Sequence, residues 1–177
     1  MRLYRYIGPQ QIADRVTASP AGCPIRSAAD VVRWARESGQ QPGPDGSVIA
    51  TFVIDATGLL LIADRHSEHV ACAGRLPVRS AGEITFALSG NEVEITAVSN
   101  QSTGYCPEPD SWAAVMESLT ASSLEPPSGF SPRCVFRLCV RCAAKNIVKD
   151  GVFECGVCGA ELSVTYNCQT ARAESDD

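Results

Sequence analysis

The feature that most constrains this chain is a pair of short cysteine motifs near its C-terminal end. CVRC spans residues 139–142 and CGVC spans 155–158, with twelve residues between them. Each CxxC turn lets two thiolates converge on one ion, and Gly156 and Gly159 relieve crowding in the second turn. Two such turns at this separation are a strong signature of a metal held by four sulfurs.

The residues between the two motifs predict how the motifs are joined. AKNIVKDGVFE (144–154) has the pattern of a hairpin that turns at Lys149, Asp150 and Gly151. Two cysteine turns joined by a hairpin form a zinc ribbon, whose closed thiolate tetrahedron holds structure and does not catalyse. Iron in the same sulfur set is the alternative metal. We therefore predict a structural zinc ion with four ligands: Cys139, Cys142, Cys155 and Cys158.

The other cysteines and the start of the chain bear on the compartment. The nine cysteines are an odd number, and MRLYRYIGPQ contains no apolar run of signal-peptide length. The spacing favours metal over disulfides, so we predict the reducing cytoplasm and expect Cys134 and Cys168 to be core thiols. The most apolar stretch, residues 48–63, is too short to span a bilayer, so we expect no membrane association.

The sequence before the cysteines predicts an α+β domain over residues 1–121. Ser27 and Asp30 form a capping box that begins a helix over 28–38, and Asp110 caps a helix that runs to about Ala121. A weaker helix and a short aromatic strand are expected at 10–16 and 3–7. Four apolar stretches predict two hairpins: TFVID (51–55) with LLLIA (59–63), and ITFAL (84–88) with VEITAV (93–98). We expect a mainly antiparallel sheet with two or three helices.

The C-terminal part of the chain divides by composition. SSLEPPSGFSP (122–132) is rich in proline, serine and glycine and predicts a linker. The cysteine-dense segment 133–168 forms the predicted zinc ribbon. Residues 169–177 are small and acidic and predict a disordered tail.

The charge of the chain bears on its partners. The net charge of −5 disfavours non-specific binding to nucleic acid or to a membrane surface, which requires a cationic field. The ribbon segment is locally basic, so nucleic-acid binding is an alternative, although aromatic residues are sparse there. A solvated face, or a contact with the acidic main domain, is the favoured interpretation of these basic residues: Arg133, Arg137, Arg141, Lys145 and Lys149.

DRHSEHVACAG (64–74) contains both histidines of the chain. A strand would place His66 and His69 on opposite faces, and a helix would turn Cys72 away from His66. A second metal site is therefore disfavoured. A zinc deaminase would need a Pro-Cys-x-x-Cys motif after His66-Ser67-Glu68, and that motif is absent. A Cys–His nucleophile pair is possible in principle, but no local pattern selects one.

Four segments in order resemble a known family: RYIGPQQ (5–11), RHSEHVACAG (65–74), AGE (81–83) and SNQSTGYCPEPDSW (99–112). Together they are similar to a domain of the plant IQ-motif calmodulin-binding family and of related bacterial effector and toxin chains. The resemblance covers about residues 3–120, and no calmodulin-binding IQ helix is visible. The matching positions are Tyr6, Gly8, Pro9, His66, Ser67, Gly74, Ala81, Gly82, Glu83, Ser102, Tyr105 and Pro107.

Two positions depart from the family pattern. Glu68 stands where the pattern has a second serine, and Gly104 stands where it has a second histidine. If that histidine acts in relatives, its loss argues against the same chemistry in this chain. The family gives no established reaction to carry over.

The resemblance implies that segments 64–74, 81–83 and 99–107 come together. A polar cluster would then form, with His66 as an acid or base near neutral pH or as one member of a hydrogen-bond network: His66, Glu83, Ser102 and Tyr105. The leading hypothesis for the whole chain is a zinc-ribbon protein that binds a macromolecular partner, in particular another protein. The alternatives are a small hydrolase or transferase that uses this cluster on a nucleotide or a modified protein, and nucleic-acid binding through the ribbon.

Overall fold

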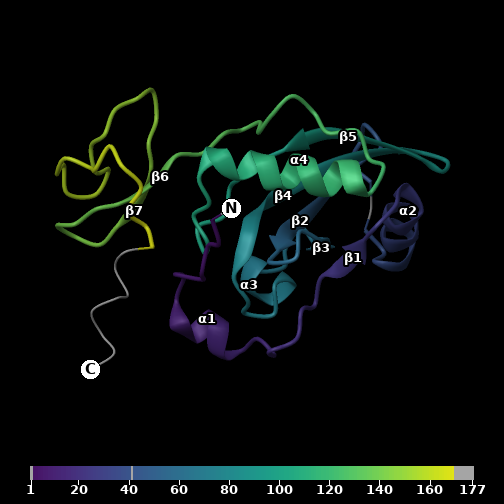
Figure 1. Cartoon of the computed structure of the whole chain (residues 1–177), viewed down its shortest axis with the longest axis horizontal. Helices are drawn as coiled ribbons and strands as arrows, with labels where there is room; N and C mark the ends of the chain where they lie inside the picture. Colours follow the sequence, from purple (N-terminus) through teal and green to yellow (C-terminus); the bar gives the residue numbers. More distant parts are fainter. Residues whose placement is uncertain (1, 41, 170–177) are drawn as a thin grey trace.

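An antiparallel sheet of five strands forms the centre of the structure, a computed structural model that describes residues 2–40 and 42–169 (Figure 1). The strand order across the sheet is β1-β3-β2-β4-β5, and every neighbouring pair is antiparallel. The strands are β1 (Cys23–Ile25), β2 (Ser47–Asp55), β3 (Leu60–Asp64), β4 (Val78–Ser89) and β5 (Glu92–Val98).

Both predicted hairpins are present in this sheet. The turn between β2 and β3 is closed by the Asp55 carboxylate, which accepts hydrogen bonds from the amides of Thr57 (2.8 Å) and Leu59 (2.9 Å). Strand β4 begins at Val78, earlier than the predicted 84, because it continues through Gly82. A Cβ atom at Gly82 would lie 1.9 Å from the Ser99 carbonyl oxygen, so only glycine fits this close approach.

The helices lie on both faces of the sheet. The predicted helices are confirmed as α2 (Ala28–Glu37) and α4 (Trp112–Ala121), and the Ser27 hydroxyl caps α2 by accepting from the Asp30 amide at 3.4 Å. The other elements are α1 (Gln10–Asp14), α3 (His69–Cys72) and the 3₁₀ helix η1 (Pro109–Ser111). Residues 3–7 do not form the expected strand, since only Tyr4 bridges to Val78.

Strand β2 shows how the two faces are separated. Phe52 and Ile54 point into a core that includes Trp34 of α2 and Leu119 of α4. Val53, which alternates with them, points into a second core with residues of α1 and α3. Both faces of β2 are therefore covered, which explains why the strand is apolar along most of its length.

The four-cysteine module, residues 133–168, follows the sheet domain. Strands β6 (Phe136–Leu138) and β7 (Lys145–Ile147) pair antiparallel. The predicted turn is confirmed, because Lys149 bridges to Val152 around two residues with positive φ, Asp150 (53°) and Gly151 (72°). The predicted fold class is confirmed as α+β, with a mainly antiparallel sheet, four short α-helices in the described part of the chain, and a C-terminal four-cysteine cluster.

The segment between the two parts, residues 122–132, packs against the sheet domain. Leu124 is buried, and the Phe130 ring meets Trp112 edge to face at 5.0 Å. The Ser131 amide donates a hydrogen bond to the Val98 carbonyl at 2.7 Å. Apart from Gln169, the predicted acidic tail lies outside the described residues. None of the helices within 2–40 and 42–169 has the length and apolar character needed to cross a bilayer.

Candidate metal centre

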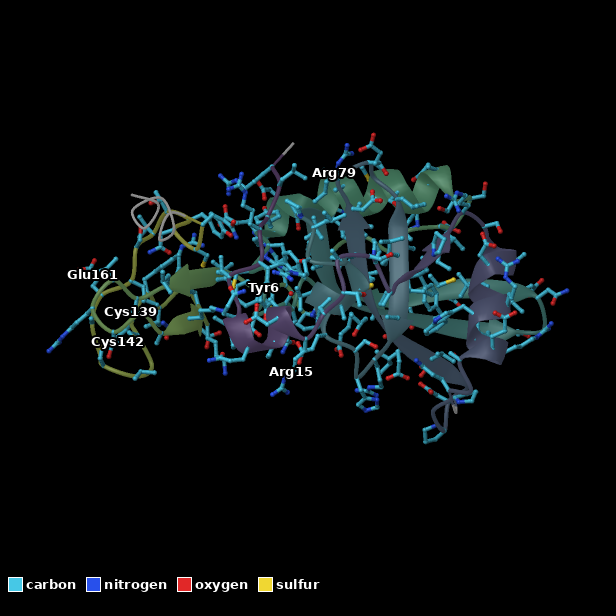
Figure 2. All side chains as sticks on the ribbon, turned by 90° about the horizontal axis from the view of Figure 1, so that it is seen from below. Tyr6, Arg15, Arg79, Cys139, Cys142 and Glu161 are labelled. Atoms are coloured by element: carbon cyan, nitrogen blue, oxygen red, sulfur yellow. The ribbon has the colours of Figure 1, made fainter. Side chains whose placement is uncertain are left out.

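The four cysteines of the two CxxC motifs converge. Figure 2 shows Cys139 and Cys142 at one end of the molecule. Their sulfur atoms all lie within 4.8 Å of one another, and two pairs are closer: Cys139 to Cys158 at 3.6 Å, and Cys142 to Cys155 at 3.7 Å. Four sulfurs about 2.3 Å from a central ion would be about 3.8 Å apart, whereas a disulfide requires about 2.05 Å. The spacing fits a shared metal ion, and all nine cysteines are free thiols.

The two cysteine turns share one backbone arrangement. In the first turn, the Ala143 amide donates to the Cys139 carbonyl at 2.9 Å; in the second, the Gly159 amide donates to the Cys155 carbonyl at 2.9 Å. The residue after the second cysteine has positive φ in both turns, 57° at Ala143 and 67° at Gly159. The module therefore presents two pairs of sulfur ligands, one from each of two turns with the same backbone geometry.

Backbone amides around the Cys155 sulfur favour its thiolate form. Those of Cys158 and Val157 lower the pKa of Cys155 to about 6, and Val157 donates to its sulfur at 3.5 Å. The Asn146 side chain also donates to the Cys155 sulfur, at 3.6 Å, and accepts from the Gly156 amide at 3.0 Å. Donors aimed at sulfur are the usual surroundings of a metal-binding thiolate.

No other metal-competent group of three or more histidine, cysteine or acidic side chains occurs within the described residues. His66 and His69 are separated by a turn: β3 ends at Asp64, and α3 begins at His69. Segment 64–74 is thus neither the strand nor the helix considered from its sequence. Cys134 and Cys168 are buried away from the four ligands, as predicted.

The residues predicted to form a catalytic cluster occupy different surroundings. The His66 side chain is 84% exposed, and its Nδ1 lies 3.1 Å from Asp64. Tyr105 is buried and donates to the Leu76 carbonyl at 2.9 Å, and its amide donates to the Ser102 hydroxyl at 3.4 Å. Across 2–40 and 42–169, no hydrogen bond or ion pair joins His66 or the Glu83 carboxylate to the other predicted members. The geometry gives no support to acid–base chemistry by this set.

The three segments that the resemblance linked do meet, but through different residues. His69 Nε2 lies 3.0 Å from the Gly82 carbonyl oxygen, and burial lowers the pKa of this histidine. The Ser99 amide donates to the Glu83 carbonyl at 2.8 Å, and the Glu83 amide donates to the Ser99 hydroxyl at 3.3 Å. These contacts hold neighbouring loops together. Sequence patterns did not select Ser99, although its place opposite Gly82 follows from the β4–β5 hairpin.

Basic residues of the module partly serve the contact with the sheet domain. The Arg137 side chain is only 7% exposed and forms an ion pair with Glu108 at 3.0 Å. Lys145 donates to the Thr103 carbonyl at 3.0 Å. These contacts agree with the interpretation that part of the basic set faces the main domain. The remaining basic residues are Arg133, Arg141 and Lys149.

No family model, curated protein or solved structure matches this chain. The resemblance to the IQ-motif family therefore stays a prediction, and the possible functions rest on the geometry described above.

Proposed function

We propose that the four-cysteine module is a structural zinc ribbon that presents an apolar surface to a partner protein. The main observation that supports this proposal is the distribution of exposed apolar side chains. Four of the seven large hydrophobic residues exposed in the described part of the chain belong to this module: Val140 (87%), Val157 (75%), Val164 (69%) and Val152 (59%).

Zinc is the metal that these ligands favour. Four thiolates form a soft donor set, and zinc takes such a set as a closed tetrahedron. Iron is bound by the same donors, and metal analysis separates the two. With four sulfur ligands the ion has no open position for substrate. The site therefore supports a structural role and a binding function for the surrounding module.

The position of the valines explains how they would bind. Val140 lies inside the first cysteine turn and Val157 inside the second, so a bound ion would fix both residues. A rigid apolar side chain loses little conformational entropy on binding. Arg141 neighbours Val140 and is exposed, which suits a partner with an apolar centre and an acidic rim. A module that exposes several large apolar side chains is a candidate interaction surface.

A protein partner is favoured over nucleic acid. Arg137 and Lys145 contact the sheet domain, which leaves three of the five basic residues for phosphates. A nucleic-acid surface would place bases on aromatic side chains. Phe136 is buried, and Phe153 faces the Arg137 guanidinium at 5.7 Å.

The test combines metal analysis with partner capture. We expect about one equivalent of zinc per chain, and neither zinc nor iron at that level would contradict the metal site. The double variant V140S/V157S should retain the zinc and lose partners that the wild type captures from cells expressing it. L3S/M116S, which alters exposed apolar residues of the sheet domain, is the matched control and should keep them. Equal capture by both variants would contradict the surface, and nuclease-sensitive capture that is lost in R141Q/K149Q would favour nucleic acid.

A further inference from the structure

A small cleft on the sheet domain lies away from the metal ligands. It forms where the N-terminal segment passes α1 and the residues that follow α3, and its volume is about 220 Å³. Its walls include two arginines, Arg5 and Arg75, and the apolar or aromatic residues Tyr6, Val70 and Pro77. The volume is below the roughly 300–1,000 Å³ of pockets for drug-sized ligands, so the cleft suits a small molecule.

Within the described residues, the two arginines of the cleft have no carboxylate partner, unlike some other arginines of the molecule. Arg2, Arg79 and Arg137 each lie within ion-pair distance of a carboxylate. Across 2–40 and 42–169, neither the Arg5 nor the Arg75 guanidinium forms an ion pair or a hydrogen bond, and no acidic residue lines the cleft. Two positively charged residues from separate segments therefore line one small cleft whose described wall contains no acidic residue.

The backbones of both arginines are held in place. Arg5 exchanges two backbone hydrogen bonds with the Gln169 side chain, each 3.0 Å long. Arg75 has φ of 68°, a left-handed conformation that is unfavourable for a residue with a Cβ atom. Its amide donates to the Val70 carbonyl at 2.9 Å, which closes the end of α3. Glycine would satisfy this turn without strain, so the turn itself does not explain an arginine at this position.

We propose that the cleft binds a phosphate monoester of a small molecule through Arg5 and Arg75. Two guanidinium groups balance the charge of about −1.5 to −2 that a phosphate monoester carries at pH 7, and their planar donors match its oxygens. Tyr6 and Pro77 provide an aromatic and apolar wall for the organic substituent. This site is separate from the valines of the zinc ribbon and would add a ligand to the proposed binding function.

The test is a titration of the full chain with inorganic phosphate and with phenyl phosphate at constant ionic strength, followed by amide chemical shifts. Both should bind saturably, with phenyl phosphate the tighter. R5Q and R75G should each weaken binding about tenfold, as expected for loss of a charge-assisted hydrogen bond. R75G also relieves the left-handed backbone, so a folding defect would not explain its loss of binding. R65Q removes another exposed arginine and is the matched control, expected to bind like the wild type.

Several outcomes would overturn the proposal. These are no saturable shift in the wild type, unchanged binding by R75G, or an equal loss in R65Q, which would indicate general charge attraction. If phenyl phosphate bound no better than inorganic phosphate, the apolar wall would not contribute to binding, and the proposal of a phosphate monoester as ligand would be wrong. A phosphotyrosine peptide that binds more than about tenfold tighter than phenyl phosphate would replace the small molecule with a protein ligand.

Discussion

The sheet domain and the four-cysteine module bury different kinds of residue. The larger core of the sheet domain contains seventeen buried residues, including the fully buried Phe52 and Ile84. The corresponding cluster around the cysteines contains three, namely Cys139, Cys155 and Leu162. A module this small cannot bury enough apolar surface to offset the entropy of ordering its chain. Metal ligation would supply the missing stability in the module, whereas apolar packing supplies it in the sheet.

Removing one sulfur ligand should separate the two parts most clearly. We expect Cys155→Ser to lose the metal and unfold the module while the sheet remains, because structural zinc contributes roughly 10 kcal/mol or more to such folds. Metal content and amide hydrogen exchange in β6–β7 and in β2–β4 would show this. Cys23→Ser, outside the cluster, is the control. Protected module amides in a metal-free Cys155→Ser chain would refute metal-dependent folding.

A substitution in the sheet core should destabilise the sheet and leave the metal site intact. Phe52 is fully buried at the centre of β2, so Phe52→Ala should lower the free energy of unfolding by about 3–5 kcal/mol. Under native conditions the variant should still carry its zinc, since the four sulfurs do not contact this core. Urea unfolding and metal analysis would measure both effects. Loss of zinc from a variant that still folds would mean that the stability of the module depends on the packing of the sheet core.

Asn100 joins the two parts and should have the next largest effect. Its side-chain amide donates to the carbonyls of Pro107 (2.9 Å) and Cys134 (2.8 Å) and accepts from the Cys134 amide (2.7 Å). Asn100→Ala would leave buried groups unsatisfied and cost about 2–4 kcal/mol. Gln169→Ala, which removes exposed hydrogen bonds to Arg5, should cost less than about 1 kcal/mol.

Urea unfolding would compare these two variants, and NMR relaxation would report whether the module tumbles with the sheet. Equal costs for Asn100→Ala and Gln169→Ala would show that the buried amide is not the main connection. Faster tumbling of the module in Asn100→Ala alone would identify Asn100 as the residue that couples the two parts.

Some of the residues behind these predictions could be identified from the sequence alone, and others could not. The convergence of the four cysteines was predictable because a CxxC turn is local, and Ser27 predicted the start of α2 for the same reason. The contacts of His69, Ser99 and Asn100 were not predicted, since each residue contacts a partner distant in sequence. Their roles follow from the close approach at Gly82 and from the packing of the module against the sheet domain. Neither feature leaves a periodic pattern in the sequence.

His69 gives the sheet domain a pH dependence of its own. Burial lowers the pKa of His69 in the folded chain below its usual value of about 6.5. As pH falls below that value, the unfolded chain takes up the proton first, so stability should decrease. His69→Gln should reduce this loss between about pH 7 and 5, measured by urea unfolding. His66→Gln, at an exposed side chain, is the control, and an equal change in both variants would contradict the assignment.

The smallest expected effect compares the two cysteine turns with each other. Ala143 and Gly159 occupy the same left-handed position, with φ of 57° and 67°. Alanine is strained there and glycine is not, so Ala143→Gly should stabilise the metal-bound module by about 0.5–1 kcal/mol, and Gly159→Ala should destabilise it by a similar amount. Competition with a zinc chelator would measure both. Two changes of the same sign would show that the turns are not equivalent, and that one pair of sulfurs is positioned by contacts beyond its own turn.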